Sequence, residues 1–462
     1  MKRKIIVLSI ASISVIALFL IGWVIHATLQ TDNSNLPPLE NPKEIYENAI
    51  SVITPIQNTV LNISVTNEMS VANAVFSETS EQTVQYDSQD HYIHLQETHI
   101  SGSHNYRIEE LFINDTVYTT VNDSSFIAQC SKEEYTKTLI PAVVLSTDLY
   151  QIITGVDNKS NYTIHFSDPI EPEKWLADTS VTLLEANGTA TISYDGKLEN
   201  STYTAAYIQD GITFKISAHV EVKQADVAIQ PPTDTSMFTP IASWEAPRTL
   251  ERACGYLMQC TNVSSSYNDS IYFEAFGDLW EQSIRLDMQS NNPLSMEITT
   301  NVRIKNDTKQ GQETTYSKKE QFQNGQYLVS NNGEQPISNQ NITAETVYTY
   351  IQNRLISTII LPQDIASADI SEDDDTLRIH FTGTNTFGNF LLKNACEILY
   401  NNTSLADNIN DKFTIKELNI YLKIETHTGL PVASGIELKG NYKKDGIPYQ
   451  LLYKAEQNYN IQ

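Results

Sequence analysis

The sequence has few cysteines and few basic residues for its length. Its four cysteines are too few and too scattered over 462 residues to form a disulfide framework; they are Cys130, Cys254, Cys260 and Cys396. Cys254 and Cys260 could pair if a helix ended between them, whereas in one continuous helix they would lie on different faces. Lysine and arginine total 30 against 56 acidic residues, which gives a formal net charge of −26. Because phosphate binding requires a concentrated basic surface, we expect no nucleic-acid partner.

The sequence also lacks the short motifs of common catalytic sites, including GxSxG, HExxH, the P-loop and GxGxxG. The best metal-binding candidate is a histidine-rich stretch, Asp90–His104, which contains His91, His94, Glu97, His99 and His104. If Ser101-Gly102 formed a two-residue turn, His99 and His104 would be cross-strand neighbours able to share a zinc or copper ion. Two ligands without a clear third are weak evidence for a site, and the corresponding stretch Tyr272–Glu281 has no histidine. We therefore favour a polar, solvated hairpin and predict no metal ligand.

Two other candidate sites have simpler structural explanations. The acidic run Glu372-Asp373-Asp374-Asp375 lacks the alternating ligand spacing and central glycine of a calcium loop, and so predicts an exposed turn. The tripeptides Ile164-His165-Phe166 and Ile379-His380-Phe381 recur, but the sequence identifies no nucleophile or acid as a partner for either histidine. Since isoleucine and phenylalanine flank each histidine, both histidines are expected to point away from the core. The sequence thus predicts no catalytic residue, no cofactor and a protein that is not an enzyme.

The N-terminal residues predict a membrane anchor. Lys2, Arg3 and Lys4 precede an uncharged run, Ile5–Ile25, long enough to cross a hydrocarbon core of roughly 30 Å as a helix. A cleaved signal peptide has an apolar region of only about 7–15 residues, so an uncleaved anchor is favoured over a cleaved signal. The basic residues would keep the N-terminus in the cytoplasm. We therefore expect a single-pass protein of the cell membrane, with the bulk of the chain extracellular on a bacterial cell surface.

An internal repeat organises the rest of the chain. Helical patterns at Pro42–Ile53 and Pro247–Met258 each lead into several alternating strands, which end in similar segments around Phe112 and Phe322. The tripeptide Ile-His-Phe then follows in both halves at nearly the same separation, which indicates duplication of a whole domain. The expected order is a cytoplasmic basic tail, a transmembrane anchor, a linker, a first domain, a proline-containing linker and a second domain, over residues 1–4, 5–27, 28–41, 42–228, 229–246 and 247–462.

The hydrophobic patterns within the repeat predict sheets covered by helices. Apolar and polar residues alternate in Thr213–Lys223 and Lys416–Glu425, which predicts strands with one buried face. Ala344–Ile359 predicts an amphipathic helix with a single apolar stripe, made of Val347, Ile351, Leu355 and Ile359. We therefore predict an α+β fold in which an N-terminal transmembrane helix precedes two tandem curved antiparallel sheets, or half-barrels, covered by helices.

Two turn motifs carry a resemblance to a known family. The segments Phe322-Gln323-Asn324-Gly325-Gln326-Tyr327 and Ile424-Glu425-Thr426-His427-Thr428-Gly429-Leu430-Pro431 resemble the "YxDGxYY" and "IDxxTGLP" turns of the LolA/LppX-like superfamily of lipoprotein carriers. The first half has looser counterparts in Phe112-Ile113-Asn114-Asp115 and Tyr194-Asp195-Gly196-Lys197, and the chain resembles in particular uncharacterised clostridial surface proteins of this group. The resemblance implies a curved antiparallel sheet with helices in its concavity, often around a hydrophobic cavity, and brings no catalytic residues. The chain departs from the family by its duplication and by lacking a cysteine for lipidation after the hydrophobic segment.

The leading hypothesis is a non-enzymatic, membrane-anchored extracytoplasmic protein with two LolA/LppX-like domains that bind a hydrophobic or lipid-like ligand. The sequence does not specify the ligand-binding residues. The alternative is a cell-envelope sensor or protein-interaction scaffold that contacts an envelope protein and has no ligand cavity. A hydrolase is disfavoured because no catalytic motif is present. An apolar cavity in either domain would favour the first hypothesis over the second.

Overall fold

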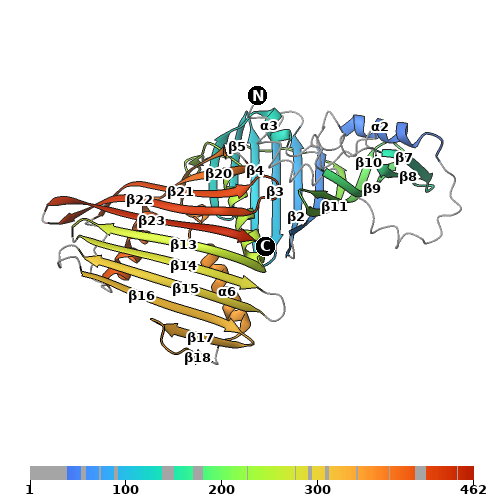
Figure 1. The fold of residues 1–462 in the computed structure, drawn as a ribbon. Coiled ribbons are helices and arrows are strands. Elements are labelled where there is room, and N and C mark those ends of the chain that lie inside the picture. The colour runs from blue at the N-terminus through green and yellow to red at the C-terminus, as the bar shows by residue number, and fades with distance from the viewer. Residues whose placement is uncertain are drawn as a thin grey trace. The chain divides into compact units, whose positions relative to one another are not determined.

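The computed structural model describes most of the chain between residues 39 and 461, in two compact units. It does not describe residues 1–38, 54–58, 72–73, 88–91, 138–149, 170–180, 226, 276, 290–293, 307–311, 340–341, 374, 401–412, 445 and 462. The first unit comprises Met1–Phe238 with Thr426–Gly429, and the second comprises Thr239–Glu425 with Leu430–Gln462. Each unit is built around one large antiparallel sheet, as Figure 1 shows.

The first unit begins with helix α2 (Pro42–Ile53), which is followed by a meander of β1 (Thr59–Val71), β2 (Ala74–Asp87), β3 (Tyr92–Ser101), β4 (His104–Ile113), β5 (Thr116–Val121) and β6 (Ser124–Gln129). After helix α3 (Lys132–Lys137), the chain returns through β7 (Tyr150–Asp157), β8 (Asn161–Pro169), β9 (Val181–Ser193), β10 (Leu198–Gln209) and β11 (Ile212–Gln224). The strand order is β6-β5-β4-β3-β2-β1-β11-β10-β9-β8-β7. The last strand therefore pairs with the first in the middle of the sheet.

The second unit begins with the short strand β12 (Thr239–Pro240) and helix α5 (Ala246–Gln259). The meander that follows consists of β13 (Asn262–Phe273), β14 (Asp278–Gln289), β15 (Ser295–Asn306), β16 (Gln312–Gln323), β17 (Gln326–Asn331) and β18 (Ile337–Asn339). The remaining elements are α6 (Ala344–Leu355), the 3₁₀ helix η5 (Pro362–Asp364), β19 (Ile365–Asp373), β20 (Thr376–Gly383), α7 (Asn385–Tyr400), β21 (Phe413–Glu425), β22 (Pro431–Lys444) and β23 (Ile447–Ile461). The order β18-β17-β16-β15-β14-β13-β23-β22-β21-β20-β19 matches that of the first unit strand for strand.

The fold is mostly β, so the expected α+β class is wrong. Strands account for most of the described residues, and the few helices are short. The physical reason is the dominance of threonine, tyrosine, isoleucine and valine, which favour strands throughout the chain. The helices serve as covers: α2 packs on its sheet through the ring of Tyr46, 4.8 Å from that of Phe166 in β8.

The alternating patterns correctly locate the buried face of the strands. In β21 the apolar residues Leu418, Ile420, Leu422 and Ile424 are all buried. Helix α6 begins at Ala344 as predicted, with the hydroxyl of Thr343 accepting a hydrogen bond from the Thr346 amide. The helix ends at Leu355, however, because tighter bonds take over: the Ser357 amide donates to the Arg354 carbonyl. Ile359 is buried but lies beyond the helix.

The structure does not support the predicted transmembrane anchor. No helix in the described part of the chain is long and apolar enough to cross a membrane. The longest of these helices, α7, has 16 residues and is about 24 Å long, shorter than a hydrocarbon core of about 30 Å. The segment 5–27 that was expected to span the membrane lies outside the described residues. The membrane-anchored, extracellular location inferred from that segment therefore has no support in the structure.

Candidate functional site

A cavity of about 620 Å³ lies between the apolar face of the second sheet and the helices that cover it. We call this cavity the chamber. Strands β13, β14 and β23 form one wall, and α6, the segment 356–361 and α7 form the other. Figure 1 shows α6 lying across this sheet. The volume is within the range of roughly 300–1,000 Å³ that is typical of small-molecule sites.

The chamber walls are largely apolar because alternate residues of the strands share one face. On β13 this face carries Tyr267, Asp269 and Ile271, and the register places Gln282 of β14 opposite Asp269. Ile284 and Leu286 continue the apolar wall along β14. The helical wall contributes apolar side chains that include Ile356, Phe387 and Leu391.

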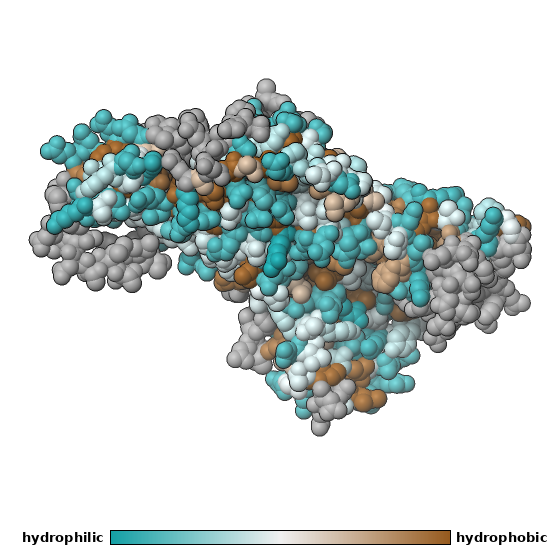
Figure 2. Space-filling view, turned by 180° about the vertical axis from the view of Figure 1, so that it is seen from behind, coloured by the Kyte–Doolittle hydropathy of each residue, from teal (hydrophilic) through white to brown (hydrophobic). Residues whose placement is uncertain are grey.

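Two large apolar side chains of the chamber lining are exposed to solvent. Phe390 is 56% exposed and Leu361 is 50% exposed. Elsewhere the protein surface is mainly hydrophilic, with hydrophobic residues in separate patches, as Figure 2 shows for one face. Exposed apolar side chains beside an apolar cavity are typical of an opening through which an apolar ligand enters.

One carboxyl group is buried within the chamber lining. Asp269 is only 7% exposed, and its Oδ2 accepts a hydrogen bond of 2.9 Å from the hydroxyl of Tyr267. Its Oδ1 has no hydrogen-bond partner among the described residues. Burial raises the pKa of Asp269 to about 7, although the bond from Tyr267 partly opposes the shift.

A guanidinium group also lines the chamber. Arg354 lies over the ring of Tyr350 at 4.7 Å and donates a hydrogen bond of 2.5 Å to the Tyr350 hydroxyl. That hydroxyl in turn points to Oε2 of Glu320, at 3.5 Å. The positive charge of Arg354 is thus connected through Tyr350 to the buried carboxylate of Glu320 in β16.

Glu320 belongs to a pair of buried glutamates that no motif in the sequence singles out. Glu110 in β4 and Glu320 in β16 occupy corresponding places in the two sheets and are 1% and 2% exposed. Each contacts a tyrosine of the helix that follows the meander. Tyr135 of α3 donates a hydrogen bond of 3.2 Å to Glu110, as Tyr350 of α6 contacts Glu320. The sequence does contain a sign of their burial. Residues two positions apart on a strand lie on the same face, and each glutamate precedes a buried phenylalanine, Phe112 or Phe322, by two positions.

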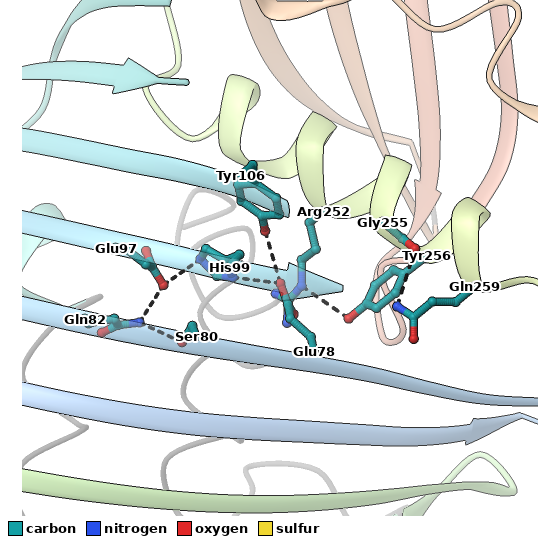
Figure 3. Close-up of polar contacts among 10 residues, drawn as sticks. All are labelled: Glu78, Ser80, Gln82, Glu97, His99, Tyr106, Arg252, Gly255, Tyr256 and Gln259. Carbon is teal, nitrogen blue, oxygen red and sulfur yellow. Dashed lines mark hydrogen bonds and ion pairs between the residues drawn. The ribbon is translucent and has the colours of Figure 1, made fainter. Parts of the chain in front are cut away.

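The first unit contains a different buried polar cluster, drawn in Figure 3. Nε2 of His99 lies 2.6 Å from Glu97, and Nδ1 lies 3.0 Å from Glu78. The imidazole stacks on the ring of Tyr106 at 4.5 Å, and the Tyr106 hydroxyl donates to Glu78 at 3.1 Å. Gln82 donates to Glu97 at 2.6 Å. This network packs a charged imidazole ring against two carboxylates within the sheet.

The structure contradicts the geometry considered for a metal site in this region. The turn is formed by Gly102 and Ser103, so Ser101 pairs with His104 and His99 faces Tyr106 instead. His94 is held by Glu109 at 2.8 Å, and His91 lies outside the described residues. Within the described ranges no group of three or more histidine, cysteine or acidic side chains could hold a metal ion.

The remaining candidates from the sequence do not form a site in the part of the chain that the structure describes. His165 is half-buried and His380 is exposed, while the flanking isoleucines and phenylalanines are in the core. The contact of His380 is the hydroxyl of Ser371, 3.2 Å away. Burial lowers the pKa of both imidazoles. In the acidic run Glu372 and Asp375 are exposed, and the side chains of residues 373 and 374 are not among those that the structure describes.

The disulfide considered between Cys254 and Cys260 does not form. Both are free thiols, and α5 continues through Cys254 to Gln259 without a break. The side chain of Cys396 lies outside the described residues. Burial raises the pKa of Cys254 and raises that of Cys260 to about 12, so neither thiol has the character of a nucleophile.

The opposite face of the second sheet carries a polar hollow of about 1,440 Å³. Its charged side chains are largely paired: Arg303 contacts Glu281 and Glu313, each at 3.1 Å. Arg378 lies 4.2 Å over the ring of Tyr421. A solvated sheet face of this composition could contact a polar partner, but its exposed ion pairs point to no particular ligand.

No family model and no curated protein matches the chain. Among solved structures, a putative AttH from Nitrosomonas europaea is 8% identical with a TM-score of 0.15, over 87% of this chain and 92% of that one. A mutant of transferrin binding protein B from Haemophilus parasuis is 7% identical with a TM-score of 0.13, over 88% and 78% of the two chains. Similarities this weak support no conclusion about function.

Proposed function

We propose that the second unit binds an elongated apolar or amphipathic ligand in the chamber, as a binding protein and not as an enzyme. The observation that carries the proposal is the apolar cavity of about 620 Å³ between the sheet and α6 and α7. The exposed Phe390 and Leu361 beside it favour access from solvent. The similarity of two turn motifs to the LolA/LppX-like superfamily supports the same reading.

The expected affinity follows from the area of the ligand that the chamber can bury. An alkyl chain gains about 0.8 kcal/mol for each buried CH₂ group. An eight-carbon chain would gain roughly 6 kcal/mol before the loss of translational and rotational freedom is subtracted. We therefore expect dissociation constants no tighter than some tens of micromolar, extending into the millimolar range, for chains of about eight carbons.

The test compares native and denatured mass spectra of the full chain and two variants. Ile356→Trp fills the chamber from its helical wall, and Ile337→Trp makes the same substitution at a side chain that is 70% exposed in β18. The wild type and Ile337→Trp should carry a bound apolar molecule that is lost on denaturation, and Ile356→Trp should not. Equal added mass on all three proteins would contradict the proposal, as would a bare wild type that also fails to bind 1-octanol.

The alternative function is a scaffold that contacts a polar partner through the hollow on the other sheet face. The observation in its favour is the size of that hollow, about 1,440 Å³. In that case partner binding would respond to Arg303→Ala and be unchanged in Ile356→Trp. The chamber hypothesis predicts the reverse.

A further inference from the structure

We propose that the chamber selects amphiphiles with a cationic head group, in which an ammonium group pairs with Asp269 between the rings of Tyr267 and Tyr453. This inference rests on the proposed ligand-binding function and names the class of ligand. It is based on a buried carboxyl group that no cation in the described part of the chain neutralises.

Asp269 is an unusual residue at its place in the sheet. The two sheets can be aligned by following the cross-strand pairs of each, starting from the corresponding residues Phe112 and Phe322. In this alignment Val65 of the first unit corresponds to Asp269 of the second. Both residues pair on their other side with an alanine. The first sheet thus shows that this position accepts an apolar side chain. A buried carboxyl group with an unpartnered oxygen costs stability, which favours a role in binding over a role in folding.

The surroundings of Asp269 fit a cation. The cross-strand neighbour on β23 is Ala455, whose side chain carries no polar group that could pair with the carboxyl group. Tyr267 and Tyr453 line the chamber on the two sides of the cross-strand pair of Asp269 and Ala455. Aromatic rings together with a carboxylate commonly bind ammonium groups in proteins. Tyr267 directs its hydroxyl to Oδ2, which leaves Oδ1 for the ligand.

Arg354 does not neutralise Asp269. Its guanidinium stacks on Tyr350 and donates to the Tyr350 hydroxyl, which leads to Glu320. The pKa of Asp269 is governed by burial and by hydrogen bonds from Tyr267 and the backbone, with no contribution from a cation. The chamber therefore has one anionic position without a counter-charge.

The same arrangement predicts how binding depends on pH. The other charged or titratable groups lining the chamber are Tyr267 of β13, Tyr453 of β23, and Tyr350 and Arg354 of α6. Burial raises the pKa of Tyr267 and raises that of Tyr453 to about 12, and arginine stays protonated. With a pKa of about 7, Asp269 would be about one-tenth ionised at pH 6 and about nine-tenths ionised at pH 8. Affinity for a permanent cation should therefore rise roughly ninefold over this interval.

The experiment measures binding of three eight-carbon probes to the full chain by calorimetry: octyltrimethylammonium, octanoate and 1-octanol. At pH 8 the ammonium should bind at least about tenfold more tightly than the alcohol. Asp269→Asn should remove that advantage and leave 1-octanol binding unchanged. Asp287→Asn, which removes a carboxylate of β14 that bonds Ser264 outside the chamber, should resemble the wild type.

The outcomes separate the two proposals. If octanoate binds best, or all three probes bind equally in the wild type and Asp269→Asn, the head-group inference is wrong and the chamber remains a ligand site. If no probe binds, the proposed function fails and the inference fails with it. Should Asp269→Asn not fold, the pH dependence of binding to the wild type still decides the matter. Octyltrimethylammonium keeps its charge at every pH, so a change in its affinity between pH 6 and pH 8 reports on the protein. Affinity that is the same at pH 6 and pH 8 would overturn the inference.

Discussion

Raising the pH should destabilise the first unit through His99. Burial by itself would lower the pKa of this imidazole, but the ion pairs with Glu97 and Glu78 outweigh burial and raise the pKa from 6.5 to about 9. A group whose pKa is higher in the folded state stabilises the fold while it is protonated. The stabilisation should be complete below pH 6.5 and should be lost as the pH rises to about 9.

The magnitude follows from the difference between the two pKa values. Each unit of difference corresponds to about 1.4 kcal/mol, so protonated His99 should contribute about 3 kcal/mol to the free energy of unfolding. The contribution refers to the first unit, whose strands β2, β3 and β4 carry the cluster.

Hydrogen exchange of the amides in β3 and β4 reports the stability of this region without interference from the second unit. The opening free energy should fall by about 3 kcal/mol between pH 6 and pH 9.5 in the wild type. His99→Gln should be destabilised at pH 6 and should show little further change at pH 9.5. His94→Gln is the matched control on the same strand, since His94 pairs with the exposed Glu109. If the wild type and His99→Gln lost the same stability between pH 6 and pH 9.5, titration of His99 could not be the cause.

Three further changes test other parts of the structure. Asp269→Val introduces the residue type of the first unit, and urea unfolding should show the protein more stable by about 1–3 kcal/mol; a loss of stability would show that the carboxyl group is structural. Tyr350→Phe removes the hydroxyl between Arg354 and Glu320 and should lower the free energy of unfolding by about 1–2 kcal/mol, whereas an unchanged urea midpoint would mean that the contact is not formed in solution. Gly435→Ala would place a Cβ 2.5 Å from the ring of Tyr421, so the melting temperature should drop; an unchanged value would mean that the ring moves aside freely.

Local patterns were sufficient for the elements that depend on neighbouring residues. The helix Pro42–Ile53 has the predicted bounds, and the alternation in Thr213–Lys223 falls within strand β11. The flanking residues of His165 and His380 lie in the core as the period of two requires. The helix after Ala344 was predicted too long, because the apolar stripe continues past the point where the hydrogen bonds tighten.

Contacts between strands depended on register, which the sequence did not determine. The turn at Gly102 lies one residue later than expected, so His99 pairs across the strands with Tyr106 and not with His104. His99 therefore forms an ion pair with Glu78 and does not share a metal ion with His104. The overestimate of helix has a related cause, since amphipathic segments are conspicuous in a sequence even where long strands make up most of the fold.

By itself the sequence indicated the repeat and the alternating faces of the strands, and it located the bounds of α2 and the start of α6, because these follow from residue order and period. Only the tertiary structure decided that Glu110 and Glu320 each meet a tyrosine of a covering helix, that Asp269 is buried where the first sheet has Val65, and that a chamber lies behind it. Burial and electrostatic environment are set by residues distant in the chain, so no local pattern can specify them.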